Sequence, residues 1–276
     1  MSKSDNDEIR RVVRDRYGGI AKVTTTCCAG SSASCCDMGD GPTLEDISVA
    51  LGYSEEQVFT VPDGSNMGLG CGNPHAIASL KEGETVLDLG SGGGFDCFLA
   101  ARAVGETGHV IGVDLTPEMV SKARTNAASG GFTNVEFRLG EIENLPVADN
   151  SVDVIISNCV INLSPEKPKV FREAFRVLKP GGRLAVSDVV ATAQLPDEVK
   201  GDLKLYAGCI SGASLIDELE HMLREAGFAN IRIQPKDESR EFIRDWAPGI
   251  DVEDFVVSAN IEAVKPSYCS QSVGEV

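Results

Sequence analysis

Short apolar runs alternate with amphipathic stretches of helical period from residue 84 onward. Buried parallel strands are continuously apolar, whereas covering helices show an apolar residue every three or four positions. The alternation therefore predicts an α/β fold, with a mostly parallel seven-stranded sheet and helices on both faces. The predicted strands cover residues 85–89, 109–114, 135–139, 152–157, 183–190, 229–234 and 255–264. The predicted helices cover residues 95–104, 117–128, 168–178, 197–207 and 214–226.

The chain before residue 84 carries a different pattern, with fewer apolar runs and more small residues. Apolar positions among charges predict a short amphipathic helix over 5–17, and Thr43 begins a second helix that ends near Gly52. Two loops rich in small residues or in glycine and proline are expected at 24–42 and 60–74.

These patterns predict three parts of the chain. Residues 1–59 form a cysteine-bearing cap, and residues 60–190 form the cofactor-binding part of the sheet. Residues 191–276 complete the sheet and contribute a helical insert.

Composition excludes several classes of partner. The 276 residues carry a formal net charge of −17, which is unfavourable for binding nucleic acid or an anionic membrane, whereas a cationic cofactor is tolerated. The charged start contains no signal peptide, and no apolar run approaches the roughly 18 residues of a membrane helix. We therefore expect a cytoplasmic location, where nine cysteines indicate metal binding, catalysis or redox chemistry rather than structural disulfides.

A glycine-rich loop follows the first strand of the sheet, in the sequence Val-Leu-Asp-Leu-Gly-Ser-Gly-Gly-Gly over 86–94. Asp88 precedes Gly90, Gly92 and Gly94, and a second acid, Asp114, ends the next strand. Glycines admit a ligand close to the backbone, and a carboxylate at the second strand end accepts both ribose hydroxyls. Taken alone, the loop also fits a dinucleotide or an ordinary tight turn.

Two further segments resemble class I methyltransferases, which have a Rossmann-like fold and bind S-adenosylmethionine. One runs from Leu139 to Asp153 and is similar to the adenine-binding segment, and the other is Leu-Lys-Pro-Gly-Gly-Arg-Leu at 178–184. The resemblance implies S-adenosylmethionine as the cofactor. The residues expected to contact it are Gly70, Asp88, Gly90, Gly92, Gly94, Asp114, Met119, Gly140, Glu141, Ile142 and Asn158.

Three cysteines are expected at the same edge of the sheet as the cofactor. Cys159 follows the fourth strand. Cys71 lies in the glycine- and proline-rich loop at 60–74, before the first strand, and Cys209 lies between glycines in the C-terminal part. Thiolates are soft ligands, so their convergence beside a methyl donor indicates a soft methyl acceptor. Cys159 alone is equally compatible with a small buried apolar residue.

The cysteine segments, together with the N-terminal cysteine cluster and Asp-Trp-Ala-Pro-Gly at 245–249, resemble the arsenite S-adenosylmethionine methyltransferase family over residues 10–265. The resemblance implies that Cys71, Cys159 and Cys209 coordinate arsenic(III). It also implies a further functional cysteine in the cluster, where we favour Cys36, then Cys35, over Cys27 and Cys28. Arsenic(III) bound by three sulfurs keeps a lone pair that attacks the sulfonium methyl, so no general base is required.

The partners expected from this resemblance are arsenite, or a thiol–arsenic conjugate, and a thiol reductant such as thioredoxin or glutathione, because methylation oxidises arsenic. Alternatives remain for the N-terminal cysteines, which also fit a zinc site or a mobile redox segment. Cys97 is interpreted as core packing, and His75 as solvent-exposed or helix-capping. For the whole chain, the alternatives are a C- or O-methyltransferase of a small metabolite, and a metalloid-binding protein without turnover.

Overall fold

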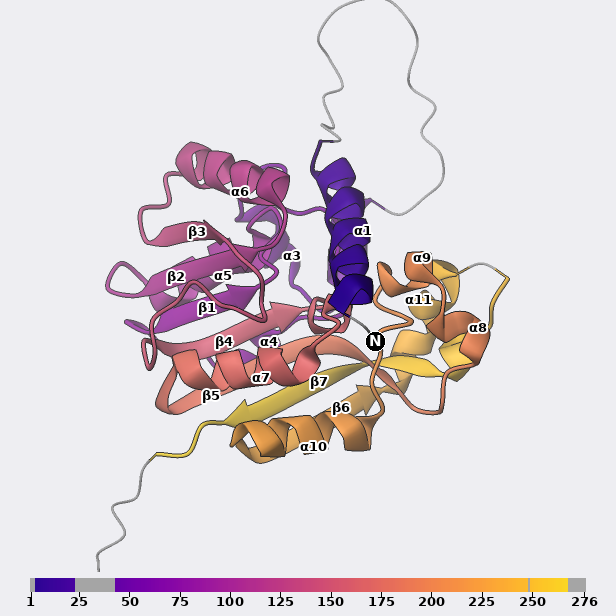
Figure 1. Ribbon diagram of the computed structural model, residues 1–276. Coiled ribbons are helices and arrows are strands. Elements are labelled where there is room, and N and C mark those ends of the chain that lie inside the picture. The colour runs from indigo at the N-terminus through magenta and orange to yellow at the C-terminus, as the bar shows by residue number, and fades with distance from the viewer. Residues whose placement is uncertain (1–2, 23–42, 248, 268–276) are drawn as a thin grey trace, which may run out of the picture.

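The computed structural model describes residues 3–22, 43–247 and 249–267, and it contains one seven-stranded sheet (Figure 1). The strand order is β3-β2-β1-β4-β5-β7-β6, and β7 is antiparallel to both of its neighbours while the remaining pairs are parallel. The strands are β1 (Thr85–Leu89), β2 (His109–Asp114), β3 (Val135–Leu139), β4 (Val152–Asn158), β5 (Leu178–Ala191), β6 (Ala229–Lys236) and β7 (Val256–Val264). The predicted fold class is therefore confirmed.

Helices cover both faces of this sheet, which explains the continuous apolar runs of the central strands. One face packs on α5 (Phe95–Val104), α6 (Pro117–Gly130) and the short α4 (His75–Ala78). The other face packs on α7 (Lys167–Val177) and α10 (Ile216–Ala226), whose buried residues include Phe171 and Leu223. β1, β2 and β4 are thus buried on both sides, as their near-continuous burial shows.

The predicted helix over 197–207 is two shorter helices, α8 (Asp197–Lys200) and α9 (Leu203–Tyr206). Asp202 lies between them, and its side chain accepts the backbone N–H groups of Lys204 and Leu205. An aspartate that caps the following turn ends one helix and begins another, which explains the break. The β5 strand also begins earlier than predicted, at Leu178, because this residue pairs with Val152.

Helices of the N-terminal part cover more of the chain than the pattern indicates. α1 runs over Lys3–Lys22, beyond the predicted 5–17, and α2 spans Leu44–Ala50 with Thr43 and Asp46 in a capping box. The short α3 (Glu55–Phe59) was not predicted, although Ser54 and Gln57 form a second capping box there.

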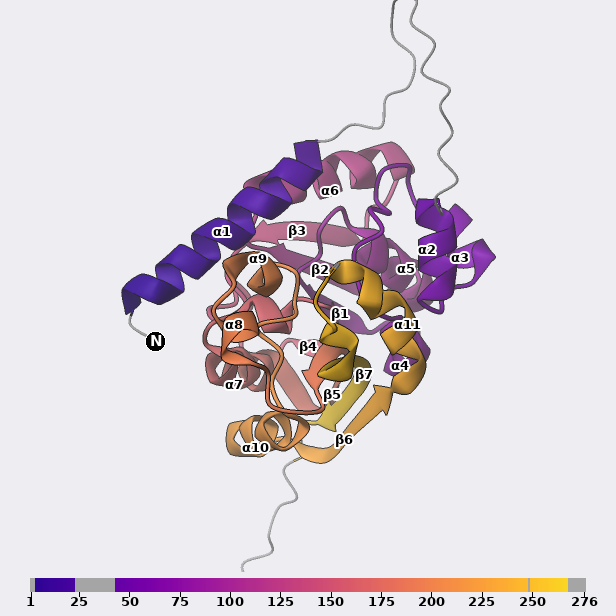
Figure 2. The same ribbon diagram turned by 90° about the vertical axis from the view of Figure 1, so that its right-hand side faces the viewer.

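The carboxyl ends of the parallel strands meet at one edge of the sheet, and segments from both ends of the chain gather over it. Figure 2 looks onto this edge and shows α1 running beside α6 and α9, with α8 and α11 (Arg240–Ile243) in front of the sheet. Within the described part of the chain, no helix combines the length and apolar character needed to cross a membrane. The predicted part boundaries at 59/60 and 190/191 stay predictions.

Candidate active site

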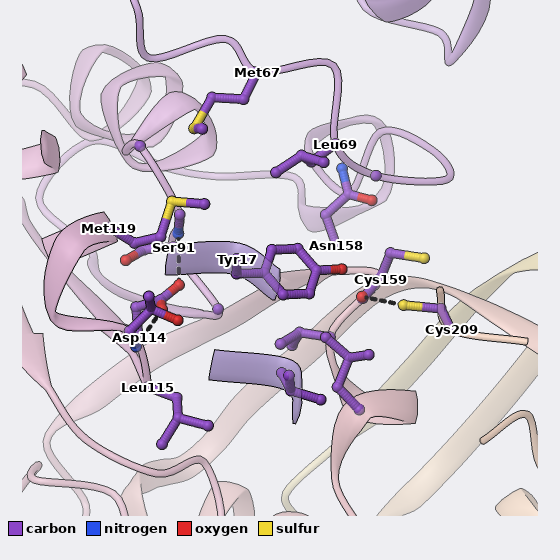
Figure 3. A pocket seen from close by; sticks show the side chains of 18 of the residues that line it. Tyr17, Met67, Leu69, Ser91, Asp114, Leu115, Met119, Asn158, Cys159 and Cys209 are labelled. Carbon is purple, nitrogen blue, oxygen red and sulfur yellow. Dashed lines mark hydrogen bonds between the residues drawn. The ribbon is translucent and has the colours of Figure 1, made fainter. Parts of the chain in front are cut away.

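A cavity of about 350 Å³ lies at this edge of the sheet and is open to solvent. Its walls come from the loop after β1, the ends of β2 and β4, the 65–70 loop, and α1. Figure 3 shows Asp114 and Met119 toward one end of the cavity and Cys159 and Cys209 toward the other. The position matches the general site of parallel α/β sheets, outside the carboxyl ends of the strands.

The glycine-rich loop after β1 forms the floor of the cavity. Gly90 has φ +75°, and a Cβ there would lie 2.4 Å from Cγ2 of Val160, so only glycine fits. Gly92 has φ +51°, with open space where its Cβ would be, and its N–H donates to Oδ2 of Asp114 at 2.9 Å. The loop thus presents bare backbone to the cavity and is tied to the next strand.

Buried carboxylates line the cavity beside this loop. Asp114 accepts one backbone N–H on each oxygen, from Gly92 and from Thr116, and the Thr116 side chain also bonds the carboxylate. Burial raises the pKa of Asp114, and burial raises that of Asp88 further because the Asp96 charge adds to it. Oγ of Ser91 is buried beside them without a hydrogen-bond partner, which is a typical sign of a position that a ligand satisfies.

The remaining residues predicted to contact cofactor fall into two groups. Met119, Glu141 and Ile142 line the cavity near Asp114, and Gly70 and Asn158 line it near the cysteines. Gly94 and Gly140 do not line the cavity. A Cβ on Gly94 would meet Phe98 at 2.7 Å, and one on Gly140 would meet Pro146 at 2.8 Å, so both serve close packing.

The helix α1 supplies lining residues that the sequence did not identify. Val13 and Tyr17 reach into the cavity, and the Tyr17 hydroxyl donates to the carbonyl of Ala207 at 3.4 Å. Arg10 joins α1 to the adenine-type segment, since its guanidinium bonds Glu143 and Glu166 at 3.2 and 2.9 Å. An amphipathic pattern predicts such a helix but not the surface on which it packs.

Cys159 and Cys209 lie at the other end of the cavity, and both adopt backbone angles that are rare outside glycine. Their φ values are +58° and +65°, a conformation that costs an L-residue about 1–2 kcal/mol. The Cys209 thiol donates to the carbonyl oxygen of Cys159 at 2.9 Å (Figure 3). Strain of this kind persists only where the surroundings enforce it, and it is often found at functional sites.

Cys71 joins the other two from behind the cavity wall. It is 2% exposed and does not line the cavity, but its thiol is close to that of Cys159. The Cys71 sulfur, the Cys159 sulfur and an Asp188 carboxylate oxygen all lie within 4.8 Å of one another. The structure therefore brings Cys71, Cys159 and Cys209 together from three segments, with Asp188 as an additional neighbour.

The surroundings raise the pKa of two of these thiols, Cys71 and Cys159. Hydrogen bonds with the Cys209 and Cys71 thiols raise the pKa of Cys159 well above its usual range, and burial adds to this. Burial raises the pKa of Cys71 as well, and it raises the pKa of Asp188 to about 6. A thiolate that forms here is a strong electron donor, because its conjugate acid is weak.

Two other expectations can be compared with the structure. Cys97 is fully buried in α5, as interpreted, and its thiol donates to Asp88 at 3.2 Å. The interpretation of His75 as solvent-exposed is wrong, because its side chain is 8% exposed and its Nε2 lies 3.2 Å from Asp96. The N-terminal cysteines Cys27, Cys28, Cys35 and Cys36 lie outside the described residues.

The chain resembles known methyltransferases along most of its length. Residues 80–227 match the family described as a methyltransferase domain. The arsenite methyltransferase of Halobacterium salinarum is 56% identical over 272 residues, covering 97% of this chain and 69% of that protein. The human arsenite methyltransferase is 36% identical over 242 residues, covering 84% of this chain and 61% of that protein.

A solved structure gives the same result in three dimensions. CrArsM, an arsenic (III) S-adenosylmethionine methyltransferase from Chlamydomonas reinhardtii, superposes with a TM-score of 0.60 at 33% identity. The match covers 82% of this chain and 74% of that chain. With a curated relative 56% identical across nearly the whole sequence, the chain belongs to the arsenite methyltransferase family.

Proposed function

We propose that this protein transfers a methyl group from S-adenosylmethionine to trivalent arsenic held by Cys71, Cys159 and Cys209. The observation that carries the proposal is that Cys159 and Cys209 line one end of the cavity with Cys71 beside Cys159, while the glycine-rich loop and Asp114 line the other end. A methyltransferase of a small metabolite requires no such group of thiols. A protein that only binds arsenic requires no glycine loop with a ribose-type acid.

The described residues fit S-adenosylmethionine. The buried Asp114 carboxylate at the end of β2 suits the ribose hydroxyls as a hydrogen-bond acceptor, and the unpartnered Ser91 hydroxyl is available to the methionine part. We assign Met119, Glu141 and Ile142, which line the cavity, to the adenine, and the buried Asp88 and Asp96 favour a cation. When bound there, the cofactor supplies an electrophilic methyl group on a positively charged sulfonium.

The thiols bind arsenite by exchange of ligands on arsenic. Each step forms one As–S bond and breaks one As–O bond, and the thiol proton leaves with the hydroxide as water. The Cys209 thiol gives up its bond to the Cys159 carbonyl to enter the arsenic shell. Arsenic held by three soft thiolates, of which Cys71 and Cys159 are strong donors, keeps its lone pair for the methyl group, so the site requires no general base.

The product must be reduced before a second cycle, because methylation formally oxidises arsenic to As(V). Two thiols supply the two electrons by forming a disulfide, and we assign this to Cys71 and an N-terminal cysteine, first Cys36. A thiol reductant such as thioredoxin or glutathione then resets the pair by exchange. A cytoplasmic location, where such reductants are available, is part of the proposal.

Speciation of arsenic tests this function directly. The protein is incubated with arsenite, a thiol and S-adenosylmethionine, and the arsenic species are separated and identified by mass spectrometry. We expect methylated arsenic in proportion to S-adenosylhomocysteine. Cofactor binding without methylated arsenic would favour a different acceptor, and arsenite binding without cofactor consumption would favour a binding protein.

A further inference from the structure

The side-chain amide of Asn158 lies between the cofactor cavity and the loop that carries Cys71. Asn158 is the last residue of β4 and immediately precedes Cys159. Its Oδ1 accepts the backbone N–H of Cys71 at 3.0 Å, and its Nδ2 donates to the carbonyl of Gly72 at 2.8 Å. One amide group therefore holds the backbone on both sides of the Cys71 side chain, through the Cys71 N–H and the Gly72 carbonyl.

Glycine at position 70 allows this contact. A Cβ on Gly70 would lie 2.8 Å from both Oδ1 and Nδ2 of Asn158, and the residue has φ +135°. The opposite side of the loop is also held, since Oγ of Ser258 donates to the Cys71 carbonyl at 2.7 Å. The Cys71 backbone is thus fixed between β4 and β7, with Asn158 as the contact on the side of the cavity.

The same amide connects this loop with the wall of the cofactor cavity. Nδ2 of Asn158 lies 3.0 Å from the Tyr53 hydroxyl, which in turn donates to Oδ1 of Asp96 at 2.7 Å. The Nδ2 group of Asn158 faces protein acceptors at Gly72, Tyr53 and Asp96, and its Oδ1 accepts the Cys71 N–H with one of its two lone pairs.

We infer that Asn158 is a positioning residue for Cys71, which sets the distance between the Cys71 and Cys159 thiols for arsenic, rather than a ligand of the cofactor. The inference rests on the proposed function, and it explains how Cys71 is held in place for arsenic binding. Three thiolates bind one arsenic only if their sulfurs are held at mutual contact, and Asn158 joins the backbones of two of the three cysteines. Without its amide, the Cys71 N–H and the Gly72 carbonyl lose their partners.

A double-mutant cycle on arsenite affinity tests this assignment. Titration calorimetry in a phosphine-reduced buffer compares the parent, Asn158→Ala, Cys71→Ser and the double variant. We expect Asn158→Ala to weaken arsenite binding about 10- to 100-fold, the range for buried polar groups left unpaired. In the Cys71→Ser background the same change should alter the affinity by less than about twofold, because residues that act as one unit are not additive.

The affinity for S-adenosylmethionine is measured as a second readout. A general structural defect, or a role of Asn158 in binding the cofactor, would lower this affinity as well. Its affinity for Asn158→Ala should stay within about threefold of the parent, whereas additive losses or an equal loss of cofactor affinity would overturn the inference. Tyr53→Phe is the matched control, because it removes one partner of Asn158 but leaves both contacts to the Cys71 loop, so arsenite affinity should be retained.

If Asn158→Ala does not fold, Asn158→Asp replaces it, since it is isosteric and keeps the acceptor for Cys71 while it loses the donor for Gly72. The same pattern of lost arsenite affinity and retained cofactor affinity is expected, and its absence would contradict the inference. A parent protein that binds no arsenite would overturn the proposed function and this inference together. A parent that binds arsenite with an unaffected Asn158 variant would overturn the inference alone.

Discussion

The two ends of the cavity differ in how the chain builds them. The cofactor end comes from neighbouring strand–loop–helix units, and its main contact joins Asp114 to Gly92, 22 residues apart in the sequence. The cysteine end joins segments that are far apart, since Asn158 contacts Cys71 across 87 residues and Cys209 contacts Cys159 across 50. The first end is therefore a local product of the sequence, and the second depends on the completed fold.

The two ends also differ in backbone strain, that is, in which residues adopt a positive φ. At the cofactor end, the residues with positive φ are glycines, which adopt it without steric strain. At the cysteine end, Cys159 and Cys209 adopt it with a side chain present, so the fold has to hold them there. The cofactor end is thus a site of a common type, and the cysteine end beside it is specialised for the acceptor. Mutations should therefore affect cofactor binding and arsenite binding separately.

The largest expected effect is at the cysteine end. Cys159→Ser and Cys209→Ser should each lower methylation of arsenite by roughly 100-fold or more, since a hard hydroxyl does not replace a thiolate and arsenic is no longer held beside the methyl. S-adenosylmethionine affinity, measured by calorimetry, should persist. Cys97→Ala is the control for loss of a buried thiol, and its arsenite affinity should match the parent. Near-parental turnover in either serine variant would make that cysteine a packing residue.

The reciprocal change is at the cofactor end. Asp114→Ala should weaken S-adenosylmethionine binding by roughly 1.5–3 kcal/mol, because charge-assisted hydrogen bonds to the ribose are lost. Arsenite affinity should remain at the parental value, which separates the two ends in the opposite direction. Unchanged cofactor affinity in the calorimeter would remove Asp114 from the cofactor site.

A smaller, selective effect is expected within the cysteine end. Cys71→Ser should lower methylation of inorganic arsenite about tenfold or more, yet retain part of the methylation of monomethylarsenite, whose third arsenic ligand is carbon. Cys36→Ser should behave in the same way if it serves loading and reduction. The rates for the two substrates are compared by arsenic speciation. Equal loss of both steps, with fold and cofactor affinity intact, would contradict the division of roles.

If Cys35→Ser shows this selectivity and Cys36→Ser does not, the assignment within the pair Cys35–Cys36 changes and the division of roles stands.

The smallest effect is a shift in pH dependence. The Cys159 thiol has a raised pKa, so at pH 8 a smaller fraction is thiolate than in an ordinary cysteine. Its rate of alkylation by iodoacetamide, followed by peptide mass spectrometry, should be low at pH 8 and keep rising above about pH 9, the range where a free cysteine levels off. A rate that levels off near pH 7 would show that the thiol is activated rather than protonated.

Most of the sheet could be predicted because its signals are local. The bounds of β1, β2, β3 and α5 follow directly from apolar runs and the glycine loop. Predictions failed where a single polar side chain decides the structure. Asp202 divides the helix near Cys209, and Ser54 begins a helix too short to show a period.

The sequence indicated individual residues of the candidate site, but not the contacts between them. Asp114 and the glycines follow from their place at strand ends, and the cysteine positions follow from a family resemblance. The packing of Tyr17 on the cavity, the proximity of Asp188 to the thiols, and the role of Asn158 on the Cys71 loop all arise from contacts across more than 25 residues. No pattern along the sequence encodes such pairs.

The central claim is that three cysteine thiols hold the arsenic. X-ray absorption at the arsenic edge, on the protein with one equivalent of arsenite, counts the atoms bound to arsenic and distinguishes sulfur from oxygen. We predict three sulfur neighbours in the parent and two in Cys209→Ser. Two sulfurs and one oxygen in the parent would contradict the claim, because an oxygen, from a retained hydroxide or from Asp188 beside Cys71 and Cys159, would then take the place of one cysteine.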